Sequence, residues 1–224
     1  MIAGRAHAGI AQAAHRPGID LPNESTLMKI LPLIVLGCSL LLAGASARAD
    51  VKLVMFRHAE KPDAGLGQLS CQGLNRALAL PGVLLAAYGK PAALYAPNPG
   101  VAKDDDGVSY NYVRPLATIE PTAIRAGLPV NTTWGWNDIA DLQAELLKPS
   151  HDGQTLYVAW EHHALEDLAR AILKKRGGDP GLVGKWHGSD FDTVYVMTLQ
   201  TRGGATFRVE KEGLDNQSSV CPGK

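Results

Sequence analysis

Short apolar runs alternate with amphipathic segments along most of the chain. Residues 51–56 (VKLVMF) and 155–160 (TLYVAW) are apolar and bounded by polar residues, which predicts two buried strands. Two shorter apolar runs, at 93–97 and 128–132, predict further strands. Apolar positions at helical spacing predict four helices, over residues 70–88, 112–126, 137–147 and 165–175.

Capping and breaking residues mark the ends of these helices. Ser70 is a good N-cap for the first, and Asn137 is the expected cap of the third. Pro81 should kink or divide the first helix, because proline removes a backbone donor inside a helix. Gly127 and the glycine pair at 177–178 are natural C-terminal stops.

The last strands differ from the others in their connection. Residues 193–199 and 205–210 are β-rich runs separated by a turn at Gly203-Gly204, which predicts an antiparallel hairpin. Elsewhere strands alternate with helices, which is typical of a mainly parallel sheet. We therefore expect an α/β three-layer sandwich with helices on both faces of the sheet and an antiparallel C-terminal hairpin, in one domain over residues 50–224.

Residues 98–111 (NPGVAKDDDGVSYN) carry Pro, Gly and three consecutive Asp, and predict a solvated loop. A calcium site is the alternative for the Asp run. The spacing of an EF-hand loop and its closing Glu are absent, so the loop is preferred.

The first 49 residues do not fit this fold pattern. Residues 1–27 show no sustained period, and we interpret them as a non-native extension before a natural start at Met28. Residues 28–49 have a charged start, an apolar core and a small-residue site at Ala47-Arg48-Ala49, which predicts a secretory signal peptide cleaved after Ala49. The protein would then be periplasmic or secreted, without stable membrane insertion. An uncleaved anchor and a lipoprotein signal ending at Cys38 are the alternatives.

The chain has 3 cysteines, and signal cleavage would leave Cys71 and Cys221. An oxidising compartment permits one disulfide between them, and two free thiols are the alternative. The 224 residues carry a formal net charge of +0, which argues against a nucleic-acid partner because that binding needs a basic face.

The two clearest strands end in the same way. The first runs into Arg57-His58 and the later one into Glu161-His162. Ligands bind at the carboxyl ends of strands in open α/β sheets, so the two histidines would face each other if these strands are neighbours. A hydrogen-bonded structural role is the alternative for either histidine alone.

Four segments, in order, carry a family resemblance. RHAE at 57–60 resembles the RHG/RHxE signature of the histidine phosphatase superfamily, which includes phosphoglycerate mutase-like enzymes. LSCQGLNRALAL at 69–80 resembles that family's L[ST]xxGxxQAxxL helix, with Arg76 where Gln is common. VRPLATIEPTA at 113–123 resembles the segment of the second arginine, and YVAWEHHAL at 157–165 that of the second histidine.

The resemblance implies roles for individual residues. His58 would be the nucleophile that carries a phosphoryl group, and Arg57, Arg114 and His162 would bind the phosphate oxygens. The substrate would be a small-molecule phosphate ester, and the scheme requires no metal or cofactor. Fold-level resemblance leaves the substrate itself undetermined, and a mutase is less expected for an exported protein.

The proton donor stays open at this point. One branch of the family uses Asp after the second histidine, and this chain has His163 there. Glu161 is the favoured donor, with Glu60, Glu120 and Asp138 as alternatives. The missing Asp also leaves two rival functions in view, a non-catalytic binder of phosphate ligands and a structural envelope protein.

Overall fold

The computed structural model describes residues 49–223. The extension predicted at 1–27, and the signal peptide predicted at 28–49 except for Ala49, lie outside the described residues. Among those that are described, no helix is long and apolar enough to cross a membrane.

One mixed sheet of six strands forms the centre of the fold, in the order β5-β2-β6-β1-β7-β8. The strand β1 pairs in parallel with β6, and antiparallel with β7 on its other side. Strands β7 and β8 form the expected hairpin and extend the same sheet. The strands are β1 (Val51–Arg57), β2 (Ala93–Tyr95), β5 (Val130–Asn131), β6 (Thr155–Trp160), β7 (Thr193–Leu199) and β8 (Ala205–Lys211).

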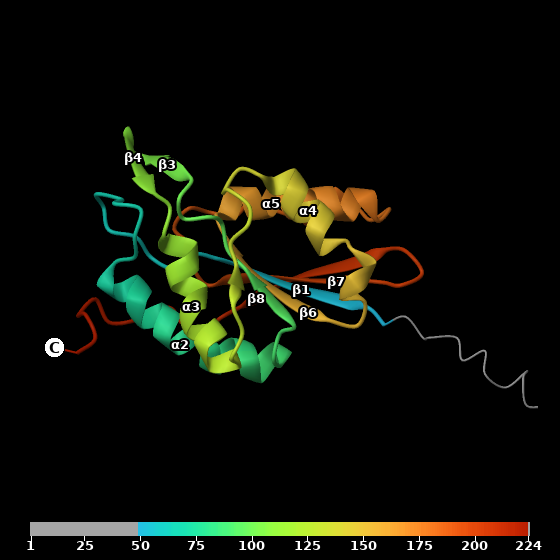
Figure 1. Cartoon of the computed structure of the whole chain (residues 1–224), viewed down its shortest axis with the longest axis horizontal. Helices are drawn as coiled ribbons and strands as arrows, with labels where there is room; N and C mark the ends of the chain where they lie inside the picture. Colours follow the sequence, from blue (N-terminus) through green and yellow to red (C-terminus); the bar gives the residue numbers. More distant parts are fainter. Residues whose placement is uncertain (1–48, 224) are drawn as a thin grey trace, which may run out of the picture. The chain divides into compact units, whose positions relative to one another are not determined.

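Helices cover both faces of this sheet, which confirms the predicted class (Figure 1). The helices α2 (Cys71–Tyr88) and α3 (Arg114–Ala126) pack on one face, with Val54 and Phe56 of β1 beneath them. On the opposite face, α4 (Ile139–Leu146) and α5 (His162–Lys175) pack with Leu53 and Met55. Successive side chains of β1 therefore point to opposite faces of the sheet and pack into two separate apolar layers. The connections also contain two 3-10 turns, η1 (Pro149–His151) and η2 (Pro180–Leu182).

Several helix boundaries follow the predicted capping residues. The Ser70 hydroxyl accepts from the amide of Gly73 and caps α2, which runs through Pro81 undivided. Gly127 ends α3 in a left-handed conformation, with φ of 65°. The expected Asn137 cap is wrong, because α4 starts one residue later with Asp138 at the N-cap position. The fourth helix starts at His162 rather than 165, because the Glu161 side chain caps it.

The loop expected over residues 98–111 is wrong in part. Strands β3 (Ala102–Asp105) and β4 (Val108–Asn111) form an antiparallel hairpin of their own. Its two-residue turn is Asp106-Gly107, with both residues at positive φ of 57° and 84°. Asp-Gly is the pair that this tight hairpin turn favours, so the sequence did contain the signal.

Cys71 and Cys221 form a disulfide, which confirms the predicted pairing. The bond ties the C-terminal tail to the first residue of α2. The side-chain amide of Asn75 adds two hydrogen bonds of 2.8 Å to the carbonyls of Ser218 and Val220. The tail is therefore fastened beside the start of α2 by both covalent and polar contacts.

Candidate active site

The two histidine-bearing strands are direct neighbours. Arg57 at the end of β1 is in register with Trp160 at the end of β6, and the backbone amide of His58 donates to the Trp160 carbonyl at 2.9 Å. Since β1 and β6 are parallel, both chains leave the sheet at the same edge. His58 and His162 therefore come to one edge of the sheet, as the matching strand endings predicted.

His58 is buried and held in one tautomer. Its Nδ1 lies 2.8 Å from the Ala59 carbonyl, which can only accept, so Nδ1 carries the proton and Nε2 keeps its lone pair. The amide of Ala59 in turn donates to the Thr118 hydroxyl at 2.9 Å. Burial, with the charges of Arg57 and Arg114, lowers the His58 pKa to about 3. The ring is a neutral imidazole with a free nitrogen at neutral pH.

Arg57 is positioned by its own backbone at the end of β1 and by the loop before β7. Its Nη1 donates to the carbonyls of Gly188 at 2.6 Å and Asp190 at 3.1 Å. The guanidinium lies over the ring of Phe191, 3.9 Å from its centroid. Burial lowers its pKa to about 10, which still leaves it charged. The buried Nε of Arg57 has no hydrogen-bond partner among the described residues.

Arg114 is the first residue of α3 and is buried as well. Its Nη1 donates to the carboxylate of Asp105 and, at 3.4 Å, to the Gly65 carbonyl. Its Nε, like that of Arg57, is buried and unpaired within the described part of the chain. Two guanidinium groups with spare donors thus lie close enough to His58 to lower its pKa. Buried donors without partners indicate a site for an anion.

His162 stands on the first turn of α5. Oε1 of Glu161 lies 2.6 Å from its Nδ1, and the other oxygen of Glu161 accepts from the Ala164 amide at 3.0 Å. Burial opposes ionisation of Glu161, but its contacts with His162 and the Ala164 amide prevail and lower its pKa to about 2. Glu161 is therefore an ionised carboxylate that holds the second histidine in place.

Solved structures share this architecture. A mycobacterial glucosyl-3-phosphoglycerate phosphatase aligns with a TM-score of 0.50 at 16% identity, covering 74% of this chain and 98% of that one. A putative phosphohistidine phosphatase SixA from Nakamurella multipartitia aligns at 0.47 and 17%, covering 72% and 96%. A phosphoglycerate mutase from Plasmodium falciparum aligns at 0.48 and 13%, covering 71% and 89%. The chain has the histidine phosphatase fold.

That fold confirms the architecture that the RHAE resemblance predicted. No family model and no curated protein matches the sequence itself. The identities are low, so the comparison establishes the fold, and the roles of individual residues rest on the geometry of the site.

The carboxyl groups considered as proton donors all have other partners or lie elsewhere. Glu60 pairs with Arg76, and Asp138 accepts from the amide of Gly135. Glu120 is exposed on α3. Glu161 is adjacent to the site, but its low pKa disfavours the donor role predicted for it, because an ionised carboxylate has no proton to give.

Three residues at this candidate site were not foreseen from the sequence. Asp105 of the β3–β4 hairpin binds both Arg114 and Lys61. Thr118 connects the backbone after His58 to α3, because its hydroxyl also donates to the Arg114 carbonyl at 2.8 Å. Tyr112 packs edge-on to His58, with ring centroids 6.1 Å apart. The Asp-Gly turn could have revealed the hairpin that carries Asp105, whereas no local pattern marks Tyr112.

One group of described residues offers metal-ligand atoms. Atoms of Glu161, His162 and His163 all lie within 4.8 Å of one another. The His162 and His163 rings lie close together, with centroids 4.0 Å apart and an interplanar angle of 35°. Glu161 and His162 already contact each other, so a metal there would compete with that contact.

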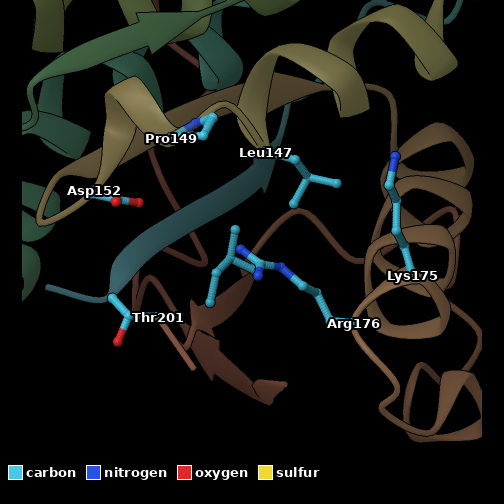
Figure 2. A pocket seen from close by; sticks show the side chains of 7 residues that line it. Leu147, Pro149, Asp152, Lys175, Arg176 and Thr201 are labelled. Atoms are coloured by element: carbon cyan, nitrogen blue, oxygen red, sulfur yellow. The ribbon is translucent and has the colours of Figure 1, made fainter. Parts of the chain in front are cut away.

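Two pockets differ in their relation to these residues. One of about 410 Å³ borders the site, because Glu161 and His163 line it together with Trp136 and Lys103. Another of about 340 Å³, drawn in Figure 2, lies at the far end of α5 and is lined by Lys175, Arg176 and Thr201 among others. The first pocket therefore borders the candidate anion site, whereas the second lies away from it.

Proposed function

We propose that the protein is an exported phosphomonoesterase that hydrolyses a small phosphate ester through a phosphohistidine on His58. The observation that carries this proposal is the state of His58, a neutral imidazole with its Nδ1 proton fixed on the Ala59 carbonyl and its Nε2 free. Two arginines with spare buried donors flank it. A nucleophile inside an anion site is what covalent phosphoryl transfer requires.

The two chemical steps use these groups in turn. In the first, His58 Nε2 attacks phosphorus, the bond to the ester oxygen breaks with its electron pair on that oxygen, and the oxygen takes up a proton and leaves as an alcohol. In the second, water attacks the phosphohistidine, the P–N bond breaks, and phosphate is released. Arg57 and Arg114 neutralise the phosphoryl oxygens throughout, and His162 donates to them most strongly in the transition state.

Hydrolysis is preferred to mutase activity because the signal sequence predicted at 28–49 would place the protein outside the cytoplasm. The Cys71–Cys221 disulfide supports export, since such bonds persist in oxidising compartments. The substrate class proposed is a small-molecule phosphate ester, with its organic part in the pocket next to Glu161. Neither nucleic acid nor membrane lipid is a proposed partner.

The second candidate is a phosphate binder without turnover. It is favoured by one observation, that the acidic groups next to the site are ionised and leave the proton donor unassigned among them. In this case the site would bind inorganic phosphate and release it unchanged.

The deciding experiment compares the full-length protein with its His58→Ala variant on p-nitrophenyl phosphate from pH 4 to pH 8. Turnover by the wild type, a trapped acid-labile phosphoenzyme, and loss of both in His58→Ala are expected. His187→Ala, which removes an exposed histidine side chain, is the matched control and should retain activity. Phosphate binding measured by calorimetry without turnover would establish the binder, and equal turnover by both proteins would overturn the assignment of His58.

A further inference from the structure

Tyr112 lies at the centre of the site although no family signature points to it. It is fully buried, between β4 and α3 and two residues before Arg114. Its ring meets the His58 ring edge-on, at an interplanar angle of 89°. The guanidinium carbon of Arg114 lies 5.0 Å from the Tyr112 ring centroid. The ring thus lies next to both the proposed nucleophile and one of the proposed phosphate ligands.

The hydroxyl of Tyr112 is buried and has no hydrogen-bond partner among the described residues. Two other buried tyrosines have partners: Tyr157 donates to the carbonyls of Leu84 and Gly89, and Tyr95 contacts Glu145. Leaving a buried hydroxyl unpaired costs free energy, so such a group calls for an explanation. A ligand that supplies the missing partner is the explanation that fits a group next to an anion site.

If the site works as proposed above, it still needs a group that donates a proton to the departing alcohol. The carboxylates nearby are held ionised. Contacts with Lys61 and Arg114 outweigh burial and lower the pKa of Asp105. Contacts with Thr193 and Lys211 likewise outweigh burial and lower the pKa of Asp190. Burial instead raises the pKa of Tyr112, aided by the charge of Glu161 and against the effects of Arg114 and Arg57, so its O–H proton is retained. Among these groups, the phenol is the one that carries a proton.

We propose that the Tyr112 hydroxyl is the general acid that protonates the leaving oxygen. As His58 Nε2 forms its bond to phosphorus, the ester P–O bond breaks and its electron pair stays on the alcohol oxygen. That oxygen takes the proton of Tyr112 and leaves as a neutral alcohol. The phenolate that remains is stabilised by Arg57 and Arg114.

The second half-reaction restores the residue. Water attacks the phosphohistidine, and the phenolate of Tyr112 takes a proton from that water. The P–N bond breaks and its electron pair returns to His58. The cycle is balanced, because the proton given to the alcohol is replaced by one from water. This inference rests on the proposed function, since a binder would need no acid.

The test compares two substrates in wild type and Tyr112→Phe. An alkyl ester such as glycerol 2-phosphate needs its leaving oxygen protonated, whereas the p-nitrophenolate of p-nitrophenyl phosphate leaves readily without help. General acids contribute about 10²–10⁴-fold, so kcat/KM for the alkyl ester should fall by that factor. The kcat/KM for p-nitrophenyl phosphate should fall by less than about tenfold. Tyr157→Phe removes another buried hydroxyl, away from the site, and should leave kcat/KM unchanged for both substrates.

Other outcomes contradict the inference in distinguishable ways. An equal loss on both substrates would make Tyr112 a phosphoryl ligand or a packing residue and overturn its role as acid, as would no loss on either. A Tyr112→Phe protein that fails to fold would show that the hydroxyl has a structural partner, which removes the premise. Wild type without turnover on either substrate would instead overturn the proposed function, together with this extension of it.

Discussion

Arg76 of α2 binds both carboxylate oxygens of Glu60, with its Nε at 3.0 and 3.1 Å and its Nη2 at 2.9 Å from Oε1. Glu60 follows His58 by two residues, and its carbonyl accepts from the Ser70 amide at 2.9 Å. The start of α2 also packs tightly here, since a Cβ added to Gly73 would lie 2.2 Å from the Glu60 carbonyl oxygen. Glu60 therefore fixes the segment after the nucleophile to α2 rather than acting in the chemistry.

Arg76 is the cation shared by a larger ionic cluster. Besides Glu60 it binds Glu212 at 2.7 Å, Asp215 at 3.1 Å and Asp192 at 3.4 Å. The guanidinium thus joins α2 to the start of β7 and to the segment after β8.

Replacing Arg76 by Gln should destabilise the protein strongly. The variant leaves the carboxylates of Glu60 and Asp192 without their cation, and breaking a buried ion pair in this way costs about 3–5 kcal/mol. Urea unfolding at pH 7 measures the change. Arg208→Gln is the control, because Arg208 is an exposed arginine whose ion pair with Glu210 should contribute less than about 1 kcal/mol. Equal effects of the two substitutions would contradict the role assigned to the cluster.

Glu212 should make the stability of the protein depend on pH. Burial raises its pKa to about 8, against the effect of Arg76, from an ordinary value near 4.5. The folded state therefore binds one more proton than the unfolded state between these values, so the contribution of Glu212 to stability falls as pH rises from about 4.5 to 8. Glu212→Gln should remove this slope.

Thermal unfolding of wild type and Glu212→Gln between pH 5 and pH 8.5 tests this expectation. The two unfolding midpoints should be similar at pH 5, and toward pH 8 that of the variant should become the higher. The expected difference is roughly 2–4 °C for each kcal/mol of difference in the free energy of unfolding. Parallel curves over this range would show that Glu212 is ionised in the folded protein at every pH measured.

Local patterns revealed the central strands but not these ionic contacts, for a physical reason. The apolar runs of β1 and β6 are continuous in sequence, and each ends directly in its histidine. Arg76 and Glu212 are 136 positions apart, and Asp105 and Lys61 are 44 apart, so their pairing depends on the completed fold. The same holds for Tyr112, whose burial and missing partner exist only once α3 packs beside β1.

Asp105→Asn should weaken phosphate binding without unfolding the protein. The Asp105 carboxylate orients Arg114 and also pairs with Lys61, and an amide keeps the shape but loses the charge. We expect KM for p-nitrophenyl phosphate and Ki for inorganic phosphate to rise by roughly 10- to 100-fold, because one charge-assisted hydrogen bond contributes about 1.5–3 kcal/mol.

Asp106→Asn is the matched control for this prediction. Asp106 is adjacent and exposed, and at its φ of 57° Asn is as well tolerated as Asp. Its steady-state constants should equal those of the wild type. A similar rise in KM for both variants would mean that charge in the hairpin acts at long range, and not through the contact of Asp105 with Arg114.

His58 should not titrate in the usual range of histidine. Burial, together with Arg57 and Arg114, lowers its pKa to about 3, from an ordinary value near 6.5. The unfolded state binds the proton first as pH falls, so this residue favours folding above pH 6.5 and loses that contribution as pH falls toward 3. Histidine Cε1–H resonances followed by NMR from pH 8 to pH 4.5 should include one, absent in His58→Ala, that hardly moves. A titration of that resonance near pH 6.5 would contradict the burial argument.

Reducing the Cys71–Cys221 disulfide should lower stability while leaving catalysis intact. The bond closes a loop across a sequence separation of 150, and bonds of this kind typically contribute roughly 2–5 kcal/mol. The tail keeps its two hydrogen bonds from Asn75, and Ser70 still caps α2, so Glu60 should stay in place after reduction. Urea unfolding with and without a phosphine reductant should show the shift, and kcat/KM at 25 °C should not change.

A Cys71→Ser/Cys221→Ser double variant is the control. Its stability should match that of the reduced wild type and should not change when the reductant is added. A fall in kcat/KM on reduction would instead show that the bond, and not the Arg76–Glu60 contact, positions the segment after His58.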